Sequence, residues 1–290
     1  MAQRIDGKEV SLFIKDRIKN ETAQLIKNTG ITPGLAVILV GDDSASHVYV
    51  RNKKLACEYC GFYSQSFELT EETTEEQLLE LICELNKNDK IDGILVQMPL
   101  PAHINPDTII NAILPEKDVD AFNPENVGKI MLGEYSFLPC TPAGVMELLK
   151  YYNIDVSGKE CVVIGRSNIV GKPMAMLLLH ENATVTICHS RTKRLADVTR
   201  RADIIVAAVG KAGFVTADMV KEGAVVIDVG INRNADGKLC GDVDFEAVEK
   251  KASYITPVPG GVGPMTISML MQNTLTSAKL KLKRSRSNGI

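Results

Sequence analysis

The sequence predicts an α/β protein of two domains, and three observations support this prediction. The chain has 290 residues, more than one domain usually contains, so that each half is long enough to bury a core. Short apolar runs alternate with helical patterns in both halves, as in parallel sheets with right-handed crossovers. A stretch rich in proline, asparagine and aspartate separates the halves, between residues 99 and 142. We therefore expect a first domain over residues 1–139 and a second over 140–268.

The first half begins with a helical pattern and continues with alternating strands and helices. Apolar residues recur at helical spacing within the first thirty residues, which end in the stop signal Asn28-Thr29-Gly30. The runs 35–40, 62–69 and 91–96 are the strand candidates, and the first of them has the form of a strand buried on both faces. Helices are expected between them, at about 46–59 and after the acidic segment that starts at Thr70.

The second half repeats the alternation after a helix expected at 142–152. Its strand candidates are 161–165, 184–188, 204–209, 224–229 and 254–255. This succession is typical of a doubly wound, nucleotide-binding domain.

Composition and charge exclude several classes of protein. The chain is 45% hydrophobic and 24% charged with a net charge of -3, as expected of a soluble protein without general attraction to nucleic acid. The N-terminus lacks the apolar core of a signal peptide, and no run of about eighteen apolar residues occurs, so we expect a cytoplasmic protein without membrane segments. The basic run from Lys279 to Arg286 predicts a solvated, frayed tail, with nucleic-acid binding as the alternative.

The seven cysteines do not form the pattern of a disulfide framework. Cys57 and Cys60 form a C-x-x-C pair, but no second close pair of ligands accompanies them. We therefore expect no metal site and no redox site.

A glycine turn joins strand 161–165 to the next helix. Gly165 permits a tight turn and Gly171 permits close packing of helix on sheet, while the helix N-terminus presents N–H groups to an anion. The spacing differs from G-x-G-x-x-G, because Ser167 stands at the middle glycine and Gly171 comes one residue late. A structural turn without a dinucleotide is therefore the alternative.

The end of strand 184–188 favours NADP over NAD. Ser190 and Arg191 follow it, where an NAD enzyme usually places an acidic residue for the adenosine ribose. A hydroxyl and an arginine, with Arg166 in the glycine turn and Arg194 nearby, suit the 2′-phosphate of NADP. The alternative is that Arg191 and Arg194 are simple surface arginines.

Five polar residues of the first half are candidates for chemistry. Tyr49 and Lys53 stand four apart on the expected helix 46–59, so their side chains share one face. Gln97 follows strand 91–96, at the end of the strand where parallel sheets form binding crevices. Asp118 and Asp120 supply carboxylates on a loop. The alternatives are a solvated lysine beside a half-buried tyrosine, and aspartates that only form turns.

Together these residues resemble the bifunctional methylenetetrahydrofolate dehydrogenase/cyclohydrolase family over nearly the whole chain. The matching segments are 49–53 (YVRNK), 92–101 (DGILVQMPLP), 115–120 (PEKDVD), 139–142 (PCTP), 165–173 (GRSNIVGKP) and 257–266 (PVPGGVGPMT). The resemblance implies an N-terminal α/β substrate domain, a C-terminal Rossmann-type NADP-binding domain and a cleft between them, lined by the loop 257–264. It also implies that the C-terminal helix, residues 269–290, packs back on the first domain.

The resemblance further implies an activity and residue roles. The chain would oxidise 5,10-methylenetetrahydrofolate to 5,10-methenyltetrahydrofolate with NADP, and would hydrolyse the product to 10-formyltetrahydrofolate. Lys53 would be the key cyclohydrolase residue, Gln97 would tune it, Tyr49 would pack along the folate, and Asp120 would hold the pterin ring. The implied NADP contacts, to which the charge argument above adds Arg191, are Gly165, Arg166, Ser167, Ser190 and Ile231.

The resemblance also implies a cytoplasmic homodimer in one-carbon metabolism, with links to purine, methionine and histidine biosynthesis. Two positions depart from the family's commonest pattern: Leu55 replaces a lysine, and Ala121 replaces a glycine. The rival interpretations are a monofunctional NAD(P) dehydrogenase of the shikimate type and a catalytically silent protein that binds folate or nucleic acid.

Overall fold

The computed structural model describes residues 1–42 and 44–287, and it divides the chain into two compact units. One unit, residues 1–12 with 139–266, contains a six-stranded sheet, and we call it the six-stranded unit. The other, residues 13–138 with 267–290, contains a three-stranded sheet and is called the three-stranded unit. Both sheets are parallel, as the alternation of strands and helices predicted.

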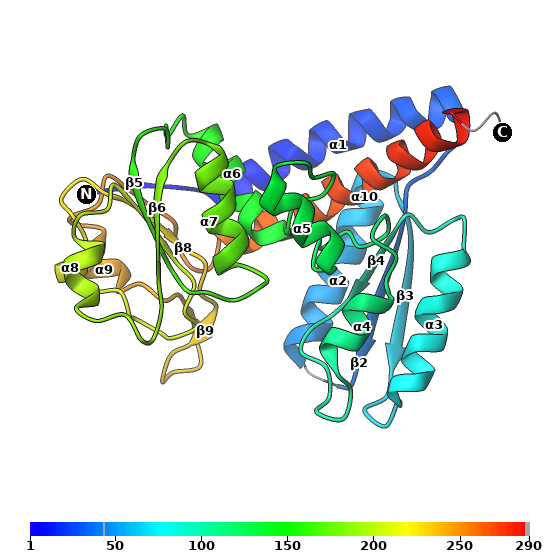
Figure 1. Ribbon diagram of the computed structural model, residues 1–290, viewed down its shortest axis with the longest axis horizontal. Helices are drawn as coiled ribbons and strands as arrows, with labels where there is room; N and C mark the ends of the chain where they lie inside the picture. The colour runs from blue at the N-terminus through cyan, green and yellow to red at the C-terminus, as the bar shows by residue number, and fades with distance from the viewer. Residues whose placement is uncertain (43, 288–290) are drawn as a thin grey trace. The chain divides into compact units, whose positions relative to one another are not determined.

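The three-stranded unit has the strand order β3-β2-β4 (Figure 1). Strand β2 is buried at every position, as expected of a parallel strand covered on both faces. One apolar cluster joins the sheet to α3 and α4. The elements of this unit are α1 (Gly7–Thr29, which begins in the other unit), β2 (Gly34–Val40), α2 (Ser44–Cys60), β3 (Tyr63–Leu69), α3 (Glu75–Lys87), β4 (Gly93–Val96), α4 (Pro106–Ala112), α5 (Pro124–Leu132) and α10 (Val262–Ser287, which also begins in the other unit).

The six-stranded unit has the strand order β1-β11-β8-β7-β5-β6. Its elements are β1 (Gln3–Arg4), α6 (Cys140–Tyr151), β5 (Glu160–Ile164), α7 (Gly171–His180), β6 (Thr184–Cys188), α8 (Leu195–Thr199), β7 (Ile204–Ala207), the 3-10 helix η1 (Ala217–Met219), β8 (Val225–Asp228), β9 (Asn232–Arg233), β10 (Leu239–Cys240), α9 (Phe245–Val248) and β11 (Tyr254–Ile255).

The order of these strands creates a switch point. From β5 the chain passes to β6 on one side, and then crosses to β7 on the other side of β5. In open parallel sheets, ligands bind beyond the carboxyl ends of the strands at such a point. We refer to the carboxyl ends of β5, β6, β7 and β8, with the loops that follow them, as the carboxyl edge.

The compact units differ from the expected domain limits most clearly at the N-terminus. Residues 1–12 belong to the six-stranded unit, because β1 pairs in parallel with β11. The Gln3 N–H donates to the Ser253 carbonyl at 2.8 Å, and the Ile5 N–H donates to the Ile255 carbonyl at the same distance. Strand β1 consists of two exposed polar residues, so it lacks an apolar run from which it could be predicted.

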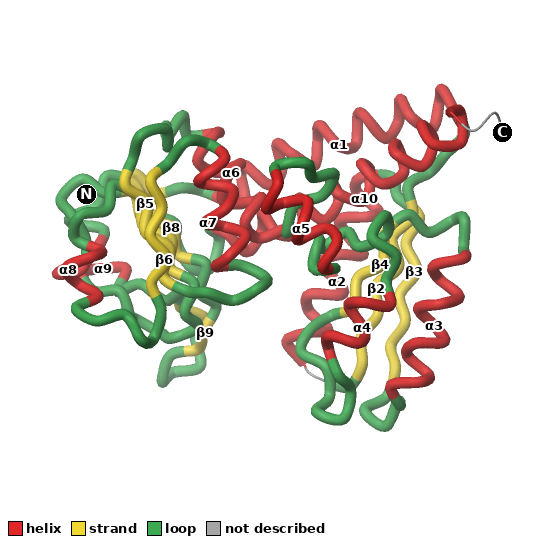
Figure 2. Tube along the Cα trace, viewed as in Figure 1, coloured by secondary structure: helices red, strands yellow, loops and turns green. Residues whose placement is uncertain are grey.

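The segment between β4 and α6 contains two short helices as well as loops (Figure 2). Asn105 caps α4 and Asn123 caps α5, and a proline follows each as the first helical residue. Asparagine caps and prolines at this position are both favourable starts of helices. The prolines and asparagines of the stretch that separates the two halves therefore include helix start signals.

The frayed tail expected at Lys279 is wrong for the residues that the structure describes. Helix α10 continues to Ser287, and three of its basic side chains pair with acids of the same unit. Lys279 lies 2.5 Å from Glu21, Lys281 lies 3.4 Å from Asp92, and Arg284 lies 3.7 Å from Glu116. Residues 288–290 lie outside the described residues. Among the helices described, none is long and apolar enough to cross a membrane.

Candidate functional site

Lys53 is buried on α2 and points its amine at a glutamine. Its Nζ donates to Gln97 Oε1 at 2.6 Å, and the residue is only 7% exposed. Gln97 Nε2 donates to the Met98 carbonyl at 2.8 Å, which fixes the amide with its oxygen toward the lysine. The neighbouring Lys54 is exposed. The alternative of a solvated lysine is therefore wrong for Lys53.

Tyr49 lies one helical turn before Lys53 on α2 and is half-buried. The i, i+4 spacing places both side chains on one face of the helix. Gln97 comes directly after β4, and its N–H donates to the Ile38 carbonyl of β2 at 2.8 Å. Two elements that are distant in sequence thus bring a ring, an amine and an amide together in the three-stranded unit.

Asp118 has a structural role in the loop that carries Asp120. Its buried carboxylate accepts from the Asn123 N–H and from Asn126 Nδ2, both at 2.8 Å. Burial raises the pKa of Asp118 above its usual value, and the hydrogen bonds from the two asparagines oppose that rise. Asp118 thus stabilises the turn, as the alternative for both aspartates stated.

Asp120 is half-buried, two residues beyond the parallel bridge between Ile94 and Asp118. The preceding Val119 carbonyl accepts from Asn273 Nδ2 of α10 at 2.8 Å. The following Ala121 has a φ of 56°, in the left-handed region that favours glycine. The departure noted at Ala121 therefore falls at a position of positive φ, and the loop adopts this conformation with alanine.

The expected cofactor residues all follow carboxyl ends of parallel strands. Gly165, Arg166 and Ser167 follow β5, Ser190 and Arg191 follow β6, and Ile231 follows β8. Apart from the partly exposed Gly165, all of these residues are exposed. The fold thus gathers them on the carboxyl edge of one sheet, next to the switch point.

The glycine turn, residues 165–171, permits close approach of backbone segments. A Cβ on Gly165, which has a φ of 137°, would lie 2.3 Å from the Ala208 carbonyl oxygen. A Cβ on Gly171 would lie 2.3 Å from the Gly165 carbonyl oxygen. Ser167 Oγ accepts from the N–H groups of Val170 and Gly171 at 3.2 and 3.3 Å. These two N–H groups already have an acceptor within the turn, which leaves the exposed cationic side chains near it as the groups suited to attract a phosphate.

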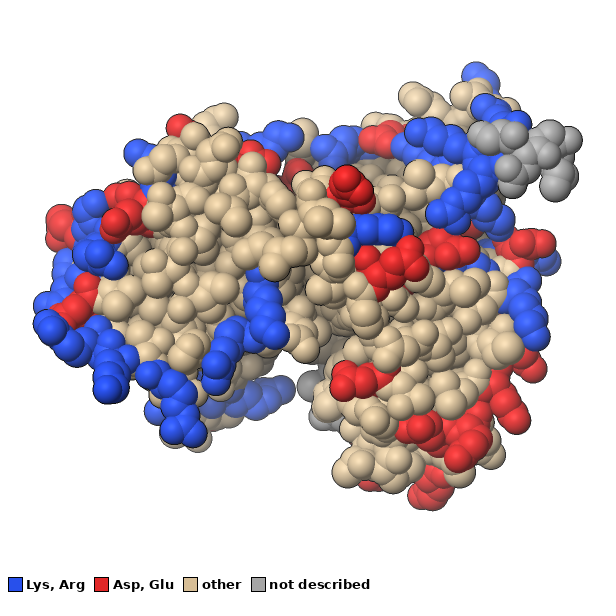
Figure 3. Space-filling model, in the orientation of Figure 1, with Lys and Arg blue, Asp and Glu red and all other residues tan. Residues whose placement is uncertain are grey.

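Two arginines at this edge fit a phosphate. Within residues 1–42 and 44–287, Arg166 and Arg191 take part in no ion pair. Arg194, in contrast, lies 2.5 Å from Asp197, and is a surface arginine with its own partner. Figure 3 shows lysine and arginine side chains gathered along one side of the six-stranded unit. The turn and its charges therefore fit the phosphates of a dinucleotide.

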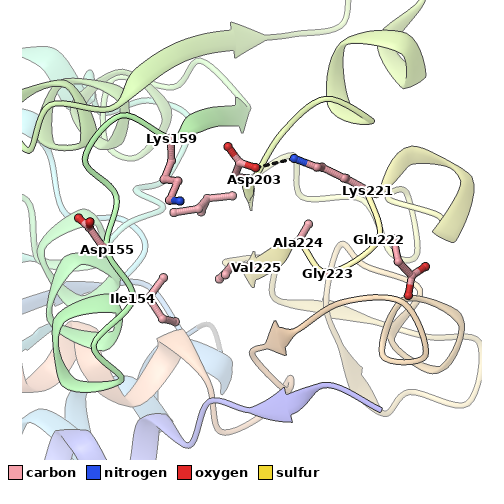
Figure 4. Close-up of a pocket in the computed structure, with 10 residues that line it drawn as sticks. Ile154, Asp155, Lys159, Asp203, Lys221, Glu222, Gly223, Ala224 and Val225 are labelled. Atoms are coloured by element: carbon pink, nitrogen blue, oxygen red, sulfur yellow. Dashed lines mark hydrogen bonds and ion pairs between the residues drawn. The ribbon is translucent and has the colours of Figure 1, made fainter.

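A cavity of about 240 Å³ lies at the opposite, amino edge of the six-stranded sheet (Figure 4). Its wall includes Ile204 and Val225, the first residues of β7 and β8, and an ion pair of 2.6 Å between Lys221 and Asp203. None of the expected site residues lines it. The cavity is therefore separate from the carboxyl edge.

The C-x-x-C pair is buried and has no reactive thiol. Burial raises the pKa of Cys57 to about 12 and that of Cys60 to about 11. The Cys57 thiol donates to Met271 Sδ at 3.8 Å. Thiols of this kind behave as packing groups rather than nucleophiles. In the part of the chain that the structure describes, no group of three or more His, Cys, Asp or Glu side chains is placed to hold a metal ion.

The sequence reasoning missed two buried carboxylates at the carboxyl edge. Asp228 is 3% exposed and Asp242 is fully buried. One signal was available, since Asp228 closes the apolar strand β8 just before Gly230, where a charged residue is unusual.

Comparison with known proteins identifies both parts of the chain. The family model "tetrahydrofolate dehydrogenase/cyclohydrolase, catalytic domain" matches residues 5–120, and the model for the NAD(P)-binding domain of the same family matches residues 139–282. A bifunctional protein FolD from Agathobacter rectalis is 61% identical over 279 residues, which are 96% of this chain and 100% of that protein.

Solved structures agree with these matches. The bifunctional methylenetetrahydrofolate dehydrogenase/cyclohydrolase FolD of Campylobacter jejuni has a TM-score of 0.94 and 55% identity, over 97% of this chain and 100% of that one. The corresponding enzyme of Trypanosoma brucei, solved with NADP cofactor and an inhibitor, has a TM-score of 0.93 and 43% identity, over 97% and 99% of the two chains.

Proposed function

The chain belongs to the tetrahydrofolate dehydrogenase/cyclohydrolase family, and from this premise we propose how its own residues perform the two reactions. It is an NADP-dependent enzyme that oxidises 5,10-methylenetetrahydrofolate to 5,10-methenyltetrahydrofolate and hydrolyses the latter to 10-formyltetrahydrofolate. Family models match both parts of the chain, and relatives match nearly its full length. The rival of a monofunctional shikimate-type dehydrogenase is therefore set aside.

The hydrogen bond of 2.6 Å between Lys53 and Gln97 carries the proposal for the cyclohydrolase reaction. Water adds to the electrophilic methenyl carbon, a proton leaves the water, and the ring opens at the carbon–nitrogen bond. Lys53 moves protons between the attacking water and the leaving nitrogen, while Gln97 holds the amine in place. A buried amine suits this task because bulk water does not compete for its hydrogen bonds.

Tyr49 and Asp120 bind the folate. The Tyr49 ring, on the same helix face as Lys53, packs along the flat substrate. The Asp120 carboxylate accepts from the amino group and ring N–H of the pterin, which together form an edge of donors. A carboxylate facing that edge discriminates against ligands that lack these donors.

The carboxyl edge of the six-stranded sheet holds NADP. When bound, NADP accepts the hydride that leaves the methylene carbon of the folate. Arg166 and Arg191 provide positive charge for the 2′-phosphate, and Gly165 lets the backbone approach the ligand. Ser167 and Ser190 offer hydroxyl groups, and the exposed Ile231 offers an apolar contact.

We also propose that the enzyme is a cytoplasmic homodimer whose folate products serve purine, methionine and histidine biosynthesis. Likeness to the family supports this proposal. Sedimentation velocity should give twice the chain mass of 31.6 kDa. A species with the mass of one chain at micromolar protein concentration would exclude the dimer.

Substitution of Lys53 tests the catalytic proposal. Lys53→Met keeps the length and apolar part of the side chain but removes the amine, so cyclohydrolase activity should fall by at least about 100-fold. The matched control is Lys54→Met, since Lys54 is the next residue on α2 and is exposed. NADP binding and thermal unfolding should be unchanged in both variants. A folded Lys53→Met enzyme that hydrolyses methenyltetrahydrofolate at the wild-type rate would refute the assignment.

A further inference from the structure

We propose that Asp242, supported by Asp228, is a positioning residue that gives two loops of the carboxyl edge the shape needed to bind the dinucleotide. This inference rests on the proposed NADP site at that edge, and adds residues that are not themselves expected to touch the cofactor. We call Asp228 and Asp242 the carboxylate pair.

Asp242 gathers the loops that follow β7 and β8 around one carboxylate. Its Oδ2 accepts from the N–H groups of Val209 and Gly210 at 2.6 and 3.0 Å. Its Oδ1 accepts from the Lys211 N–H at 2.8 Å and from Asn232 Nδ2 at 2.9 Å. Residues 209–211 follow β7, and Asn232 lies shortly after β8, so a single side chain sets the distance between the two loops.

Asp228 fixes the backbone on which Asp242 stands. Its Oδ1 accepts from the N–H groups of Gly230 and Asp242, and its Oδ2 accepts from the Val243 N–H, each at 2.9 Å. Ile231 therefore lies between Gly230, which is held by Asp228, and Asn232, which is held by Asp242. The exposed side chain expected to contact NADP is fixed on both sides by the carboxylate pair.

The loop after β7 also borders the glycine turn. The Ala208 carbonyl oxygen lies only 2.3 Å from the place where a Cβ on Gly165 would stand. Asp242 holds the next three residues of that loop through their N–H groups. Asp242 thus fixes the position of the loop after β7 beside the glycine turn, although Asp242 lies in neither of these two segments.

Both carboxylates are held by N–H donors. Within the described ranges, 1–42 and 44–287, neither forms a salt bridge. Buried charges without a countercharge depend on hydrogen bonds to replace the water that they lose. Close packing also requires glycine at position 230, where a Cβ would lie 2.3 Å from Asp242 Oδ1. The hydrogen bonds and the close packing around the carboxylate pair therefore hold the two loops in one conformation, as a preformed binding surface requires.

Two substitutions test the inference. Asp242→Asn places an amide NH₂ against N–H donors and loses the charge, so the KM for NADP should rise by about tenfold or more. Asn232→Ala removes only the contact to the loop that carries Ile231, and the KM for NADP should rise about threefold. The matched control is Asp236→Asn, which removes the charge of an exposed aspartate on the same β9–β10 hairpin.

The second activity of the enzyme provides an internal control. Hydrolysis of methenyltetrahydrofolate needs no NADP, so its rate should remain at the wild-type value in all three variants. The kcat of oxidation at saturating NADP should also change little, because the pair positions the cofactor loops and does not touch the reacting atoms. A rise in the KM for NADP alone separates positioning from general damage to the fold.

The dissociation constant for NADP, measured directly by calorimetry, distinguishes the possible failures. If Asn232→Ala binds NADP as tightly as wild type, the inference is overturned, even if Asp242→Asn fails to fold. If wild type binds NADP and both variants bind it equally well, only the inference falls. If wild type itself does not bind NADP, the proposed function and the inference fall together.

Discussion

At the scale of single residues, this chain holds buried carboxylates mainly with N–H groups. Asp118 is bonded by Asn123 and Asn126, and the carboxylate pair is bonded by loop amides. Sequence patterns do not reveal such partners, because an aspartate in a loop has the same appearance whether it forms a turn or binds a ligand. The two roles become distinct only when the donors around each carboxylate are known.

The titration of Asp228 should be visible in the pH dependence of stability. Burial raises its pKa from 3.8 to about 6, and the nearby Asp242 adds to the rise, against hydrogen bonds from three backbone N–H groups. An acid with a raised pKa binds its proton more tightly in the folded state. Its contribution to stability is therefore full below about pH 4 and is lost as the pH rises through about 6, a change of about 3 kcal/mol.

Urea unfolding of wild type and Asp228→Asn at pH 4, 5 and 6 measures this contribution, because the variant lacks the titrating group. The free energy of unfolding of wild type relative to the variant should decline across this range. A difference between the two proteins that stays constant with pH would contradict the raised pKa.

Substitution of Asp120 should raise the KM for folate and leave the KM for NADP unchanged. Asp120→Asn replaces one acceptor oxygen by a donor that faces the donor edge of the pterin, so the KM for folate should rise about tenfold or more in both reactions. The exposed Asp107 provides the control Asp107→Asn. Steady-state kinetics with varied folate and varied NADP separate the two effects, and an unchanged folate KM in both reactions would remove Asp120 from the site.

The sequence identified Lys53 and Gln97 as candidates but did not predict their contact. The i, i+4 spacing correctly placed Tyr49 and Lys53 on one face, and the strand pattern correctly placed Gln97 at the end of β4. Their contact depends on packing between two elements separated in sequence, and no local periodicity contains that information. The burial of Lys53 was equally hidden, since lysines are mostly exposed.

At the scale of elements, α10 supports the loop that carries Asp120. Asn273 Nδ2 donates to the carbonyls of Val119 and Leu138, both at 2.8 Å, and Ser277 Oγ donates to the Glu116 carbonyl at 2.7 Å. The C-terminal helix, which is distant in sequence, thus holds the loop that carries Asp120 in place.

Loss of Asn273 should destabilise the enzyme more than loss of its neighbour. Asn273→Leu leaves the Val119 and Leu138 carbonyls without this donor, at a cost of about 2–4 kcal/mol in the free energy of unfolding. Gln272→Leu, the control, removes a more exposed hydrogen bond with Arg17 and should cost less than about 1 kcal/mol. Urea unfolding measures both, and equal costs would show that the bonds from Asn273 are not important for stability.

The longer strands and helices were predictable, whereas β11 was the only two-residue strand of the described residues that the sequence predicted. The runs at 35–40, 62–69 and 184–188 gave strands within a residue or so of their observed limits. The first has the continuous apolar sequence of a buried parallel strand, whereas the other two are partly exposed edge strands. Strand β1 forms by pairing with the distant β11, whereas β9 and β10 pair with each other across a short hairpin. The basic run of α10 looked like a solvated tail because its partners, Glu21, Asp92 and Glu116, are far away in sequence.

At the scale of the whole molecule, the two activities draw on residues of different units. The proposed folate and cyclohydrolase residues lie in the three-stranded unit, and the proposed NADP residues lie in the six-stranded unit. The helices α1 and α10 each begin in the six-stranded unit and end in the three-stranded unit. Alternation of strands and helices was sufficient to predict two α/β parts, but assignment of residues 1–12 required the pairing of β1 with β11.

One assay on the wild-type protein tests the central claim that a single chain performs both reactions. Purified enzyme is given 5,10-methylenetetrahydrofolate with NADP or with NAD, and the reduced cofactor and the methenyl product are followed separately in the same sample. We expect reduced NADP to form faster than reduced NAD, without accumulation of the methenyl product, because the same chain hydrolyses it. Methenyl product that accumulates in step with reduced NADP would show that the chain lacks the cyclohydrolase activity, and no turnover with either cofactor would contradict both assignments.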